Sequence, residues 1–598
     1  MSKFQAKSKE MIFESDNVKV AILRLALPTI VSQLITTVYN LADTFWVGKL
    51  NDSYQLAALS IIFPVQLFMT ALGNLFGIGA GTCISNYLGA KESDKAKRAS
   101  AFAIWGGVIV AALLSLIVGV WKEPFLRLLK STENLDAYAA TYLDWVVVFG
   151  AVPAVFNMVV ANVIRGEGYS LHAGLGLSLG GVLNIALDPF FVLPFGLNMN
   201  IKGAAIATLI SNVVTTLYFA ILLIVIRKKT VVSFSPKKAC LAVKEKIARN
   251  VLFTGLPSAL QTMLSAVSNL VLNSLMIGYG ETAEAAIGVT KKIDAVPFGM
   301  VTGLAQGAAP LIAYNNGAKK YDKMKTTLKL SLCYCVGLAI TVLIVVESAA
   351  GALIEVFIKD ASTVTYGEKF LRLHCASLPF MAVTFMLVSY FQAVGAKGKA
   401  FLLSIIRKGI VDIPLMYLLN MLIPVYGIVA CQPITDVISA TVGVILYVLW
   451  NIEITSVGTG TVTSAVQEQL CSDGKLPKAI IFGMPQGSSS PSIPTIRPIT
   501  STLSNSVSFV CESTDILSPG ERLSFVISMR RSFKTTPFEF TVSIGPLPLQ
   551  RVVLFPITLH GRFIANGPSN SPEGRYTSPI LFGPCFKNLG NLFKFHFF

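Results

Sequence analysis

The sequence carries little charge for its length. Only 14% of its 598 residues are charged, 53% are hydrophobic, and the mean hydropathy is +0.65. Soluble domains carry roughly a quarter charged residues, so this composition excludes a disordered chain and argues against a soluble globular protein. The net charge of +17 could suggest a nucleic-acid partner. However, the basic residues form short clusters between long apolar runs, a distribution typical of membrane proteins. We therefore expect a lipid bilayer and no nucleic acid as partner.

Paired cysteines, clustered histidines and catalytic motifs are also missing. The nine cysteines form no CxxC pair and the four histidines are isolated, so no disulfide framework or zinc site is predicted. The sequence contains no HExxH, Walker A or GxSxG motif, which argues against an enzyme and against an ATP-driven pump. The polar start MSKFQAKSKE is not followed by a short apolar core with a cleavage site, so we expect no cleaved signal peptide.

Long apolar runs dominate the chain up to residue 452. A helix that spans a bilayer needs about 20 mostly apolar residues, and twelve segments meet this requirement. The sequence therefore predicts an all-α integral membrane protein with twelve transmembrane helices. The predicted spans are 25–48, 55–80, 101–121, 139–164, 172–195, 203–226, 253–278, 285–314, 328–350, 371–394, 400–423 and 427–450.

The distribution of lysine and arginine predicts the orientation of these spans. With the N-terminus in the cytoplasm, the inner segments hold 27 Lys and Arg before residue 456, and the outer segments hold ten. The inner segments include the loop from Lys397 to Lys408. We therefore expect a multi-pass protein of the cell membrane with a cytoplasmic N-terminus.

The chain also repeats itself. GAGTCISNYLGAKESDKAK (79–97) matches GAAPLIAYNNGAKKYDKMK (307–325) without a gap, so the spacing between matched positions is constant. Upstream, LPTIVSQL (27–34) parallels LPSALQTM (256–263). Internal matches in the same order indicate a duplication, and six spans in each half give both copies the same topology. The two lobes are then related by an axis along the membrane normal.

A third match pairs Asp188 with Asp412 and Gly203 with Gly427, and the spacing is the same for both pairs. The duplication predicts the organisation of the whole chain. The expected parts are a cytoplasmic N-terminal arm (1–20), an N lobe (21–227), a cytoplasmic linker (228–248), a C lobe (249–452) and a C-terminal extension (453–598).

Two carboxylates inside predicted spans are functional candidates, because a charge within a bilayer is costly. Asp43 and Asp188 lie at one depth, roughly 24 Å along their helices at 1.5 Å per residue. Asn184 and Asn40 are within one helical turn of them. Adjacent carboxylates cannot cheaply both stay ionised, and hard cations prefer oxygen ligands, so this group could hold a proton or Na⁺. Alternatively, Asp188 could cap a broken helix, because Pro189 follows it.

The first span also carries Pro28, which could kink the helix or could simply mark its first turn. Pro257 has the matching place in the C lobe, but Leu272 or a neighbour stands opposite Asp43. The ionic residues are therefore predicted to concentrate in the N lobe. Lys292 and Asp294 could form a pair at the membrane interface, and Asp412 has no assigned role.

Several motifs together resemble a known family. They are P-x(10)-YN-x-x-D-x-x-x-VG from Pro28 to Gly48, GAGTCISNYLGAK, NIALDPFF followed by KGAAIATLIS, and IAYNNGAKKYDKMK. Over residues 15–452 the chain resembles the MATE (multidrug and toxic compound extrusion) family, in particular its DinF- and MepA-like branches. The resemblance implies an exporter of amphipathic, often cationic, compounds that is driven by the entry of H⁺ or Na⁺.

The resemblance also implies roles for individual residues. In DinF-like relatives, an aspartate of the first helix, an asparagine and an aspartate of the fifth, and a threonine of the sixth form the cation site. These positions correspond to Asp43, Asn184, Asp188 and Thr208. No cofactor is implied beyond the coupling ion, and no metal beyond a possible Na⁺.

Other positions are implied to shape the first helix and the substrate cavity. The kink proline corresponds to Pro28, and the tyrosine four residues before the aspartate corresponds to Tyr39. Tyr39, Asn40 and Gln261 are expected to face the substrate cavity. A different branch of the family has a glutamate in the seventh helix where this chain has Gln261, so a cation site in the C lobe is not implied.

Three functions are consistent with such a chain. The first is cation-coupled antiport that exports small amphipathic molecules by alternating access, carried out by a monomer. The second is a lipid or oligosaccharide flippase, which would need basic residues in its cavity; few Lys or Arg fall within the predicted spans, which favours export. The third, a membrane-embedded enzyme, lacks a catalytic motif.

The extension after residue 452 has a different composition. From residue 456 onward it holds fourteen of the chain's 28 prolines but only three alanines. The fragments RLSFVISM and RVVLFPITL could be strands of a small β-rich domain. We favour the alternative that the irregular stretch 453–598 is an accidental extension, for example from a shifted reading frame, and is dispensable.

Overall fold

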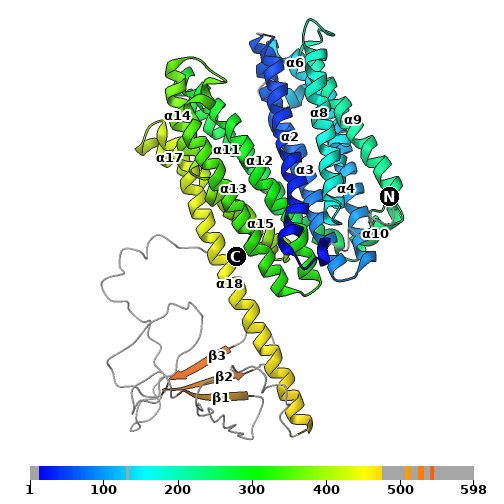
Figure 1. Cartoon of the computed structure of the whole chain (residues 1–598), viewed down its shortest axis with the longest axis vertical. Coiled ribbons are helices and arrows are strands. Elements are labelled where there is room, and N and C mark those ends of the chain that lie inside the picture. The colour runs from blue at the N-terminus through cyan, green and yellow to red at the C-terminus, as the bar shows by residue number, and fades with distance from the viewer. Residues whose placement is uncertain are drawn as a thin grey trace. The chain divides into compact units, whose positions relative to one another are not determined.

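The computed structural model describes residues 12–50, 52–128, 133–473, 506–513, 523–530 and 539–544. The chain divides into two compact units, Met1–Glu468 and Gln469–Phe598, which are described separately. The first unit consists of long helices (Figure 1), as the apolar runs predict.

The N lobe contains the helices α2 to α9. The side chain of Asn17 accepts a hydrogen bond from the backbone N–H of Val20 and so caps α2, and Asp52 caps α3 in the same way through Tyr54 and Gln55. The helices are α2 (Val18–Gly48), α3 (Ser53–Gly89), α4 (Ser93–Val120), α5 (Lys122–Leu128), α6 (Glu133–Leu143), the π-helical turn η1 (Asp144–Val148), α7 (Ala151–Gly166), α8 (Ser170–Val192) and α9 (Asn200–Ile226).

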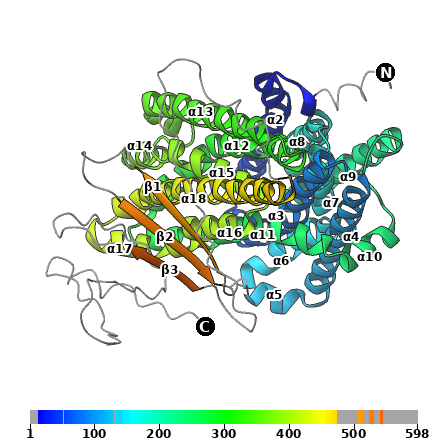
Figure 2. The same cartoon turned by 90° about the horizontal axis from the view of Figure 1, so that it is seen from below.

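The linker contributes one short helix, α10 (Pro236–Lys244), and the C lobe follows it. Seen along the helices, the C-lobe helices gather on one side and α4, α7, α8 and α9 on the other (Figure 2). The C lobe comprises α11 (Ile247–Ile277), α12 (Glu281–Gly317), α13 (Tyr321–Glu355), α14 (Ala361–Cys375), α15 (Leu378–Ala393), α16 (Lys397–Ile405), the π-helical turn η2 (Ile406–Ile410), α17 (Asp412–Leu422) and α18 (Tyr426–Asp473).

Eleven of the twelve predicted spans correspond to helices that can cross a membrane. Among the described residues, nine single helices are long and apolar enough, and two pairs bent by 43° and 42° add two more spans. The remaining segment, 400–423, is helical but is divided into α16, η2 and α17, of 9, 5 and 11 residues. It also carries three charged residues, Arg407, Lys408 and Asp412. This predicted span is therefore an interrupted helix.

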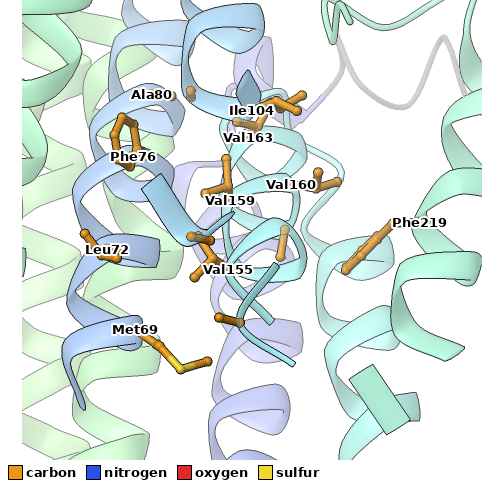
Figure 3. Packing of buried hydrophobic residues seen from close by; sticks show 14 of the residues in the cluster. Met69, Leu72, Phe76, Ala80, Ile104, Val155, Val159, Val160, Val163 and Phe219 are labelled. Carbon is orange, nitrogen blue, oxygen red and sulfur yellow. The ribbon is translucent and has the colours of Figure 1, made fainter. Parts of the chain in front are cut away.

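Each lobe has a core of interdigitated apolar side chains. In the N lobe, Leu72 and Phe76 of α3 pack against Val155 and Val159 of α7, with Ile104 of α4 beside them (Figure 3). Small residues at four-residue spacing on α3 allow the close approach of α7, since a Cβ atom at Gly73, Gly77 or Gly81 would meet Met158 or Asn162. These glycines therefore serve helix packing.

The two lobes meet through pairs of helices that the duplication relates. The most extensive packing between them joins α3 to α11 and α2 to α12, and α2 and α12 lie side by side in Figure 1. At the ends of α3 and α12, a Cβ atom on Gly89 would collide with the carbonyl oxygen of Tyr314, and one on Gly317 with that of Asn86. Asn86 and Tyr314 are a matched pair of the duplication, as Gly89 and Gly317 are, so this contact is two-fold symmetric.

Helix packing also fixes which residues of the fifth and eleventh spans correspond. A Cβ atom on Gly181 would meet the side chain of Ile35, and one on Gly409 would meet that of Leu264. Ile35 and Leu264 directly follow the matched segments 27–34 and 256–263 and continue their alignment. Gly181 and Gly409 are therefore structural equivalents.

This equivalence corrects the pairing expected from the sequence. Three residues beyond the glycines, Asn184 corresponds to Asp412, and four residues further Asp188 corresponds to Met416. The expected match of Asp188 with Asp412 is wrong by one helical turn. Its cause is the connection to the next helix, which is Leu193–Met199 in the N lobe but only Ile423–Val425 in the C lobe.

Beyond residue 452 the described residues are not wholly irregular. Helix α18 continues to Asp473, and three strands, β1 (Ser506–Ser513), β2 (Leu523–Arg530) and β3 (Glu539–Ile544), form an antiparallel sheet in that order. Ser506 pairs with Arg530, and Arg530 with Glu539. The fragment RLSFVISM is thus a strand, as expected, whereas RVVLFPITL lies outside the described residues.

The symmetric glycine contact can be tested by substitution. Gly317→Ala places a methyl group against the backbone of Asn86, so we expect a destabilisation of about 1–3 kcal/mol by overpacking, measured as a lower melting temperature of the purified protein. Gly288→Ala on the same helix is the matched control, because nothing lies within 4 Å of its Cβ position. Equal melting temperatures for the two variants would show that the contact is not tight.

The separate second unit leads to a prediction about truncation. A chain that ends after Glu468 keeps every helix of both lobes up to the boundary of the first unit. We expect it to insert into membranes and to melt at the temperature of the full chain, as measured on purified protein. Loss of insertion or a lower melting temperature would show that the extension contributes to folding.

Candidate cation site and the buried charges of the two lobes

The first two site residues lie on continuous helices. Helix α2 passes through Pro28, which lies inside it rather than at its start, and carries Asp43 with 6% of its surface exposed. Helix α8 continues beyond Pro189 to Val192, and Asp188 is fully buried. The alternative in which Asp188 caps a broken helix is therefore excluded.

Asp43, Asn184, Asp188 and Thr208 come together, as the resemblance implies. Asn184 Nδ2 donates to Asp188 Oδ1 and to Thr208 Oγ1, both at 3.3 Å. The carboxyl group of Asp43 lies within reach of the side chains of Asp188 and Asn184. We call these four residues the N-lobe cluster; they come from α2, α8 and α9.

The N-lobe cluster contains more acceptors than donors. Among the described residues, Asp43 Oδ1, Asp188 Oδ2 and Asn184 Oδ1 are buried oxygens with no hydrogen-bond partner. Buried polar atoms are almost always paired, so an exception requires an explanation. Two carboxylate oxygens and one amide oxygen without partners are the acceptors that a proton or a hard cation such as Na⁺ would satisfy.

The fourth span adds a tyrosine that the sequence did not indicate. Tyr142 is buried, lies near Asp43 and Asp188, and its hydroxyl accepts a hydrogen bond of 3.2 Å from Gln66 Nε2. Tyr39 also lies near Asp43 and stands against the Cα of Gly181. The role of Tyr39 in a substrate cavity stays a prediction. Tyr142 gave no sequence signal, because its proximity follows only from the packing of α6.

A second polar group continues from Thr208 along α9. Asn212 donates to the carbonyl of Thr208 at 3.0 Å, and Asn157 of α7 donates to the carbonyl of Asn212 at 2.8 Å. Thr216 donates to Asn157 Oδ1 at 2.9 Å. Asn212 lies one turn after Thr208, so helical spacing could have indicated it. These bonds hold α7 and α9 together beside the cluster.

The two remaining cavity candidates do not join the N-lobe cluster. Asn40 is exposed. Gln261 is buried in α11, and its Nε2 has no hydrogen-bond partner among the described residues. The roles of Asn40 and Gln261 in a substrate cavity therefore stay predictions.

The C lobe contains a buried charge network that the sequence analysis missed. Arg407 Nε donates to Asp436 Oδ1 at 2.6 Å, and Lys408 Nζ donates to Asp412 Oδ2 at 3.0 Å. Gln432 joins the two pairs, because its Oε1 accepts from Lys408 at 2.6 Å and its Nε2 donates to Asp436 Oδ2 at 2.8 Å. We call these five residues the C-lobe network. The prediction of the orientation counted Arg407 and Lys408 as residues of a cytoplasmic loop. In the structure both are buried within the C lobe.

The C-lobe network borders a second polar group, which surrounds the buried His374. His374 Nε2 lies 3.2 Å from Asp294 Oδ2 and 3.4 Å from Lys291 Nζ. Asp294 therefore pairs with His374. The expected interfacial pair of Asp294 with Lys292 is not formed. Asp436 could have been found from the sequence, because a carboxylate within a predicted span was the signal that identified Asp43.

The buried pair Arg407–Asp436 leads to a stability prediction. Asp436→Asn leaves the Arg407 guanidinium buried without a counter-charge, so we expect a loss of about 3–5 kcal/mol, seen as a lower melting temperature and a lower yield of folded protein. The double variant Arg407→Leu/Asp436→Leu should recover most of this loss. Glu92→Gln, which breaks the exposed pair with Lys95, is the control and should change little. A double variant no more stable than Asp436→Asn would contradict the charge-based explanation.

Comparison with known proteins supports the fold and the duplication. The MatE family model matches residues 28–190 and 257–418, one stretch in each lobe. Two multidrug export proteins named MepA are similar to this chain: that of Staphylococcus saprophyticus is 30% identical and that of Staphylococcus aureus strain N315 is 29% identical. Each alignment runs over 438 residues and covers 73% of this chain and 95% of the relative.

Solved structures give the same result. A crystal structure of MATE in complex with MaL6 superposes with a TM-score of 0.69 at 25% identity, and covers 75% of this chain and 99% of that one. An outward-facing structure of a multidrug resistance MATE family transporter of the MOP superfamily gives 0.68 at 25% identity, with coverage of 75% and 98%. With the helical spans and the family match in both lobes, these likenesses show that the chain belongs to the MatE family of multi-pass membrane transporters.

Proposed function

We propose that the protein exports amphipathic, often cationic, drugs or metabolites across the cell membrane in exchange for H⁺ or Na⁺. Family membership supports transport rather than catalysis. The similar proteins are multidrug export proteins, which supports the substrate class. The proposed orientation has the N-terminus in the cytoplasm, in line with the distribution of lysine and arginine.

One observation carries the coupling part of this proposal, namely the three unpaired oxygens of the N-lobe cluster. Two buried carboxylates close together repel each other unless a positive charge lies between them. The hydrogen-bond donors of the N-lobe cluster, the amide of Asn184 and the hydroxyl of Thr208, are both neutral. The missing charge must come from solution, which makes the cluster a site for an exchangeable ion.

Exchange of that ion accounts for export by mutual exclusion. A coupling ion that binds Asp43 and Asp188 removes negative charge with which a cationic substrate would otherwise pair, so each weakens the binding of the other. Entry of the ion from outside would then release the substrate. Helix α2 carries both Asp43 and Pro28. Since Pro28 removes one backbone hydrogen bond, it would let α2 bend as the charge on Asp43 changes.

The buried cations of the C lobe bear on the flippase alternative. Arg407 and Lys408 are among the few basic residues within the spans, and both are buried. However, Asp436 and Asp412 pair with them and leave the network without net positive charge. A pyrophosphate-linked substrate would find no surplus of cations in the C-lobe network, so export remains the better proposal.

The proposed coupling can be tested by dye efflux from vesicles in which pH and sodium gradients are imposed separately. Asp43→Asn removes one of the two charges, so we expect a loss of gradient-driven efflux of at least tenfold, with the folded protein still inserted. Asp188→Asn should behave in the same way.

The matched control for these variants is Asp94→Asn. Its carboxylate is 82% exposed on α4, and we expect unchanged efflux. Efflux at the full rate from Asp43→Asn vesicles would contradict the proposed coupling site.

A further inference from the structure

The duplication allows the N-lobe cluster to be compared with its own copy in the C lobe. The alignment of 27–34 with 256–263 places Leu272 at the position of Asp43. The equivalence of Gly181 with Gly409 places Met416 at the position of Asp188. Leu272 and Met416 belong to one buried apolar cluster. The C lobe therefore lacks the carboxylate pair and packs two apolar side chains in its place.

The other two positions of the N-lobe cluster, those of Asn184 and Thr208, are occupied in the C lobe by residues of the C-lobe network. Asp412 stands at the position of Asn184. Gln432 stands at the position of Thr208, because Gly203 and Gly427 pack against equivalent carbonyls, those of Phe191 and Leu419. In the N lobe, Asn184 and Thr208 are bonded directly to each other. In the C lobe the ammonium of Lys408 lies between the two corresponding side chains, 3.0 Å from Asp412 Oδ2 and 2.6 Å from Gln432 Oε1.

At the N-lobe position equivalent to Lys408 there is no side chain that could take its part. The equivalent position is Gly180, where even a Cβ atom would collide with the hydroxyl of Thr215. Helix α9 thus closes the space through which a tethered cation could enter the N-lobe cluster. In the C lobe, Lys408 reaches the network from the η2 turn and is 7% exposed.

The hydrogen-bond balance of the two copies is opposite. The N-lobe cluster has three buried oxygens without a partner. In the C-lobe network every carboxylate and amide oxygen has a hydrogen-bond partner. Ser268 and Cys431 donate to the carboxylate of Asp412. Arg407 donates to both oxygens of Asp436. The buried unpaired atom of the C-lobe network is a donor, Arg407 Nη1. One copy needs a cation, and the other already contains its own.

We propose that Lys408 is a built-in cation that occupies the C-lobe copy of the coupling site, so that the transporter exchanges its coupling ion in the N lobe only. The part about exchange in the N lobe rests on the proposed function. The role of Lys408 in the C lobe does not, and it can be tested separately.

The test uses the purified full-length chain with the N-lobe cluster neutralised by Asp43→Asn and Asp188→Asn. In this background Lys408→Met removes the ammonium and leaves Asp412 without a counter-charge. We expect the melting temperature in tetramethylammonium chloride to fall by about 5 °C or more, since a buried charge loses its partner. Ammonium chloride at the same ionic strength should restore at least half of the fall, because NH₄⁺ matches the lost head group and tetramethylammonium is too large.

Two further variants complete the experiment. Lys408→Met/Asp412→Asn removes both charges and should melt close to the background protein, with no response to ammonium. Lys325→Met, at an exposed lysine of α13, is the control and should show neither the fall nor the rescue.

Two results would overturn the proposal. The first is a Lys408→Met variant as stable as the background protein. The second is a fall in melting temperature that Asp412→Asn repairs but ammonium does not. Lys408 and Asp412 would then form a structural ion pair at a place that no free ion can occupy. Since the N-lobe cluster is absent from this background, neither result depends on whether the proposed coupling there is correct.

Discussion

Two carboxylates, Asp43 and Asp188, lie buried side by side within a bundle of membrane-spanning helices, and the hydrogen bonds around them leave three oxygens unpaired. In a medium with little water, such a group cannot persist as two bare negative charges. We propose that it takes up a proton, a metal cation or a positively charged substrate. The neighbouring groups, the amide of Asn184, the hydroxyl of Thr208 and the phenol of Tyr142, are neutral and do not balance this charge.

The duplicated architecture gives the same chain two versions of one site. In the N lobe, Gly180 leaves room only for α9, and the carboxylates remain unpaired. In the C lobe, two apolar residues replace the carboxylates, and Lys408 and Arg407 balance Asp412 and Asp436. The contacts of Gly89 and Gly317 between the lobes preserve the symmetry of the duplication. The two lobes differ in their charged interiors, and the exchange of an ion is proposed for the N-lobe interior.

Much of this arrangement follows from the sequence, and the exceptions have physical reasons. Apolar runs predict the spans, because spanning helices must satisfy their backbone internally. The span 400–423 is interrupted by η2, which the apolar content does not reveal. Asp43 and Asp188 are visible as carboxylates in apolar segments. The sequence does not identify Lys408 as a buried charge, because a lysine near the end of a span is equally consistent with a cytoplasmic loop.

The register between the lobes shows a different limit of sequence comparison. The match of Asp188 with Asp412 depends on an identical residue, whereas the packing of Gly181 and Gly409 against α2 and α11 depends on geometry. A connection shorter by four residues shifts the apparent match by about one turn of helix. Only the contacts between helices show that Met416, and not Asp412, takes the place of Asp188.

The central claim is that substrate and coupling ion compete for one N-lobe cluster. The most direct test is the affinity of the purified, folded protein for a cationic dye, measured across a range of pH and sodium concentration. We predict that the affinity falls as protons or sodium ions are added, with one apparent midpoint that belongs to the carboxylate pair. The double variant Asp43→Asn/Asp188→Asn should lose little more affinity than either single variant, because the two residues act as a unit. Affinity that stays constant with both pH and sodium would contradict the account, even if the protein exports the dye.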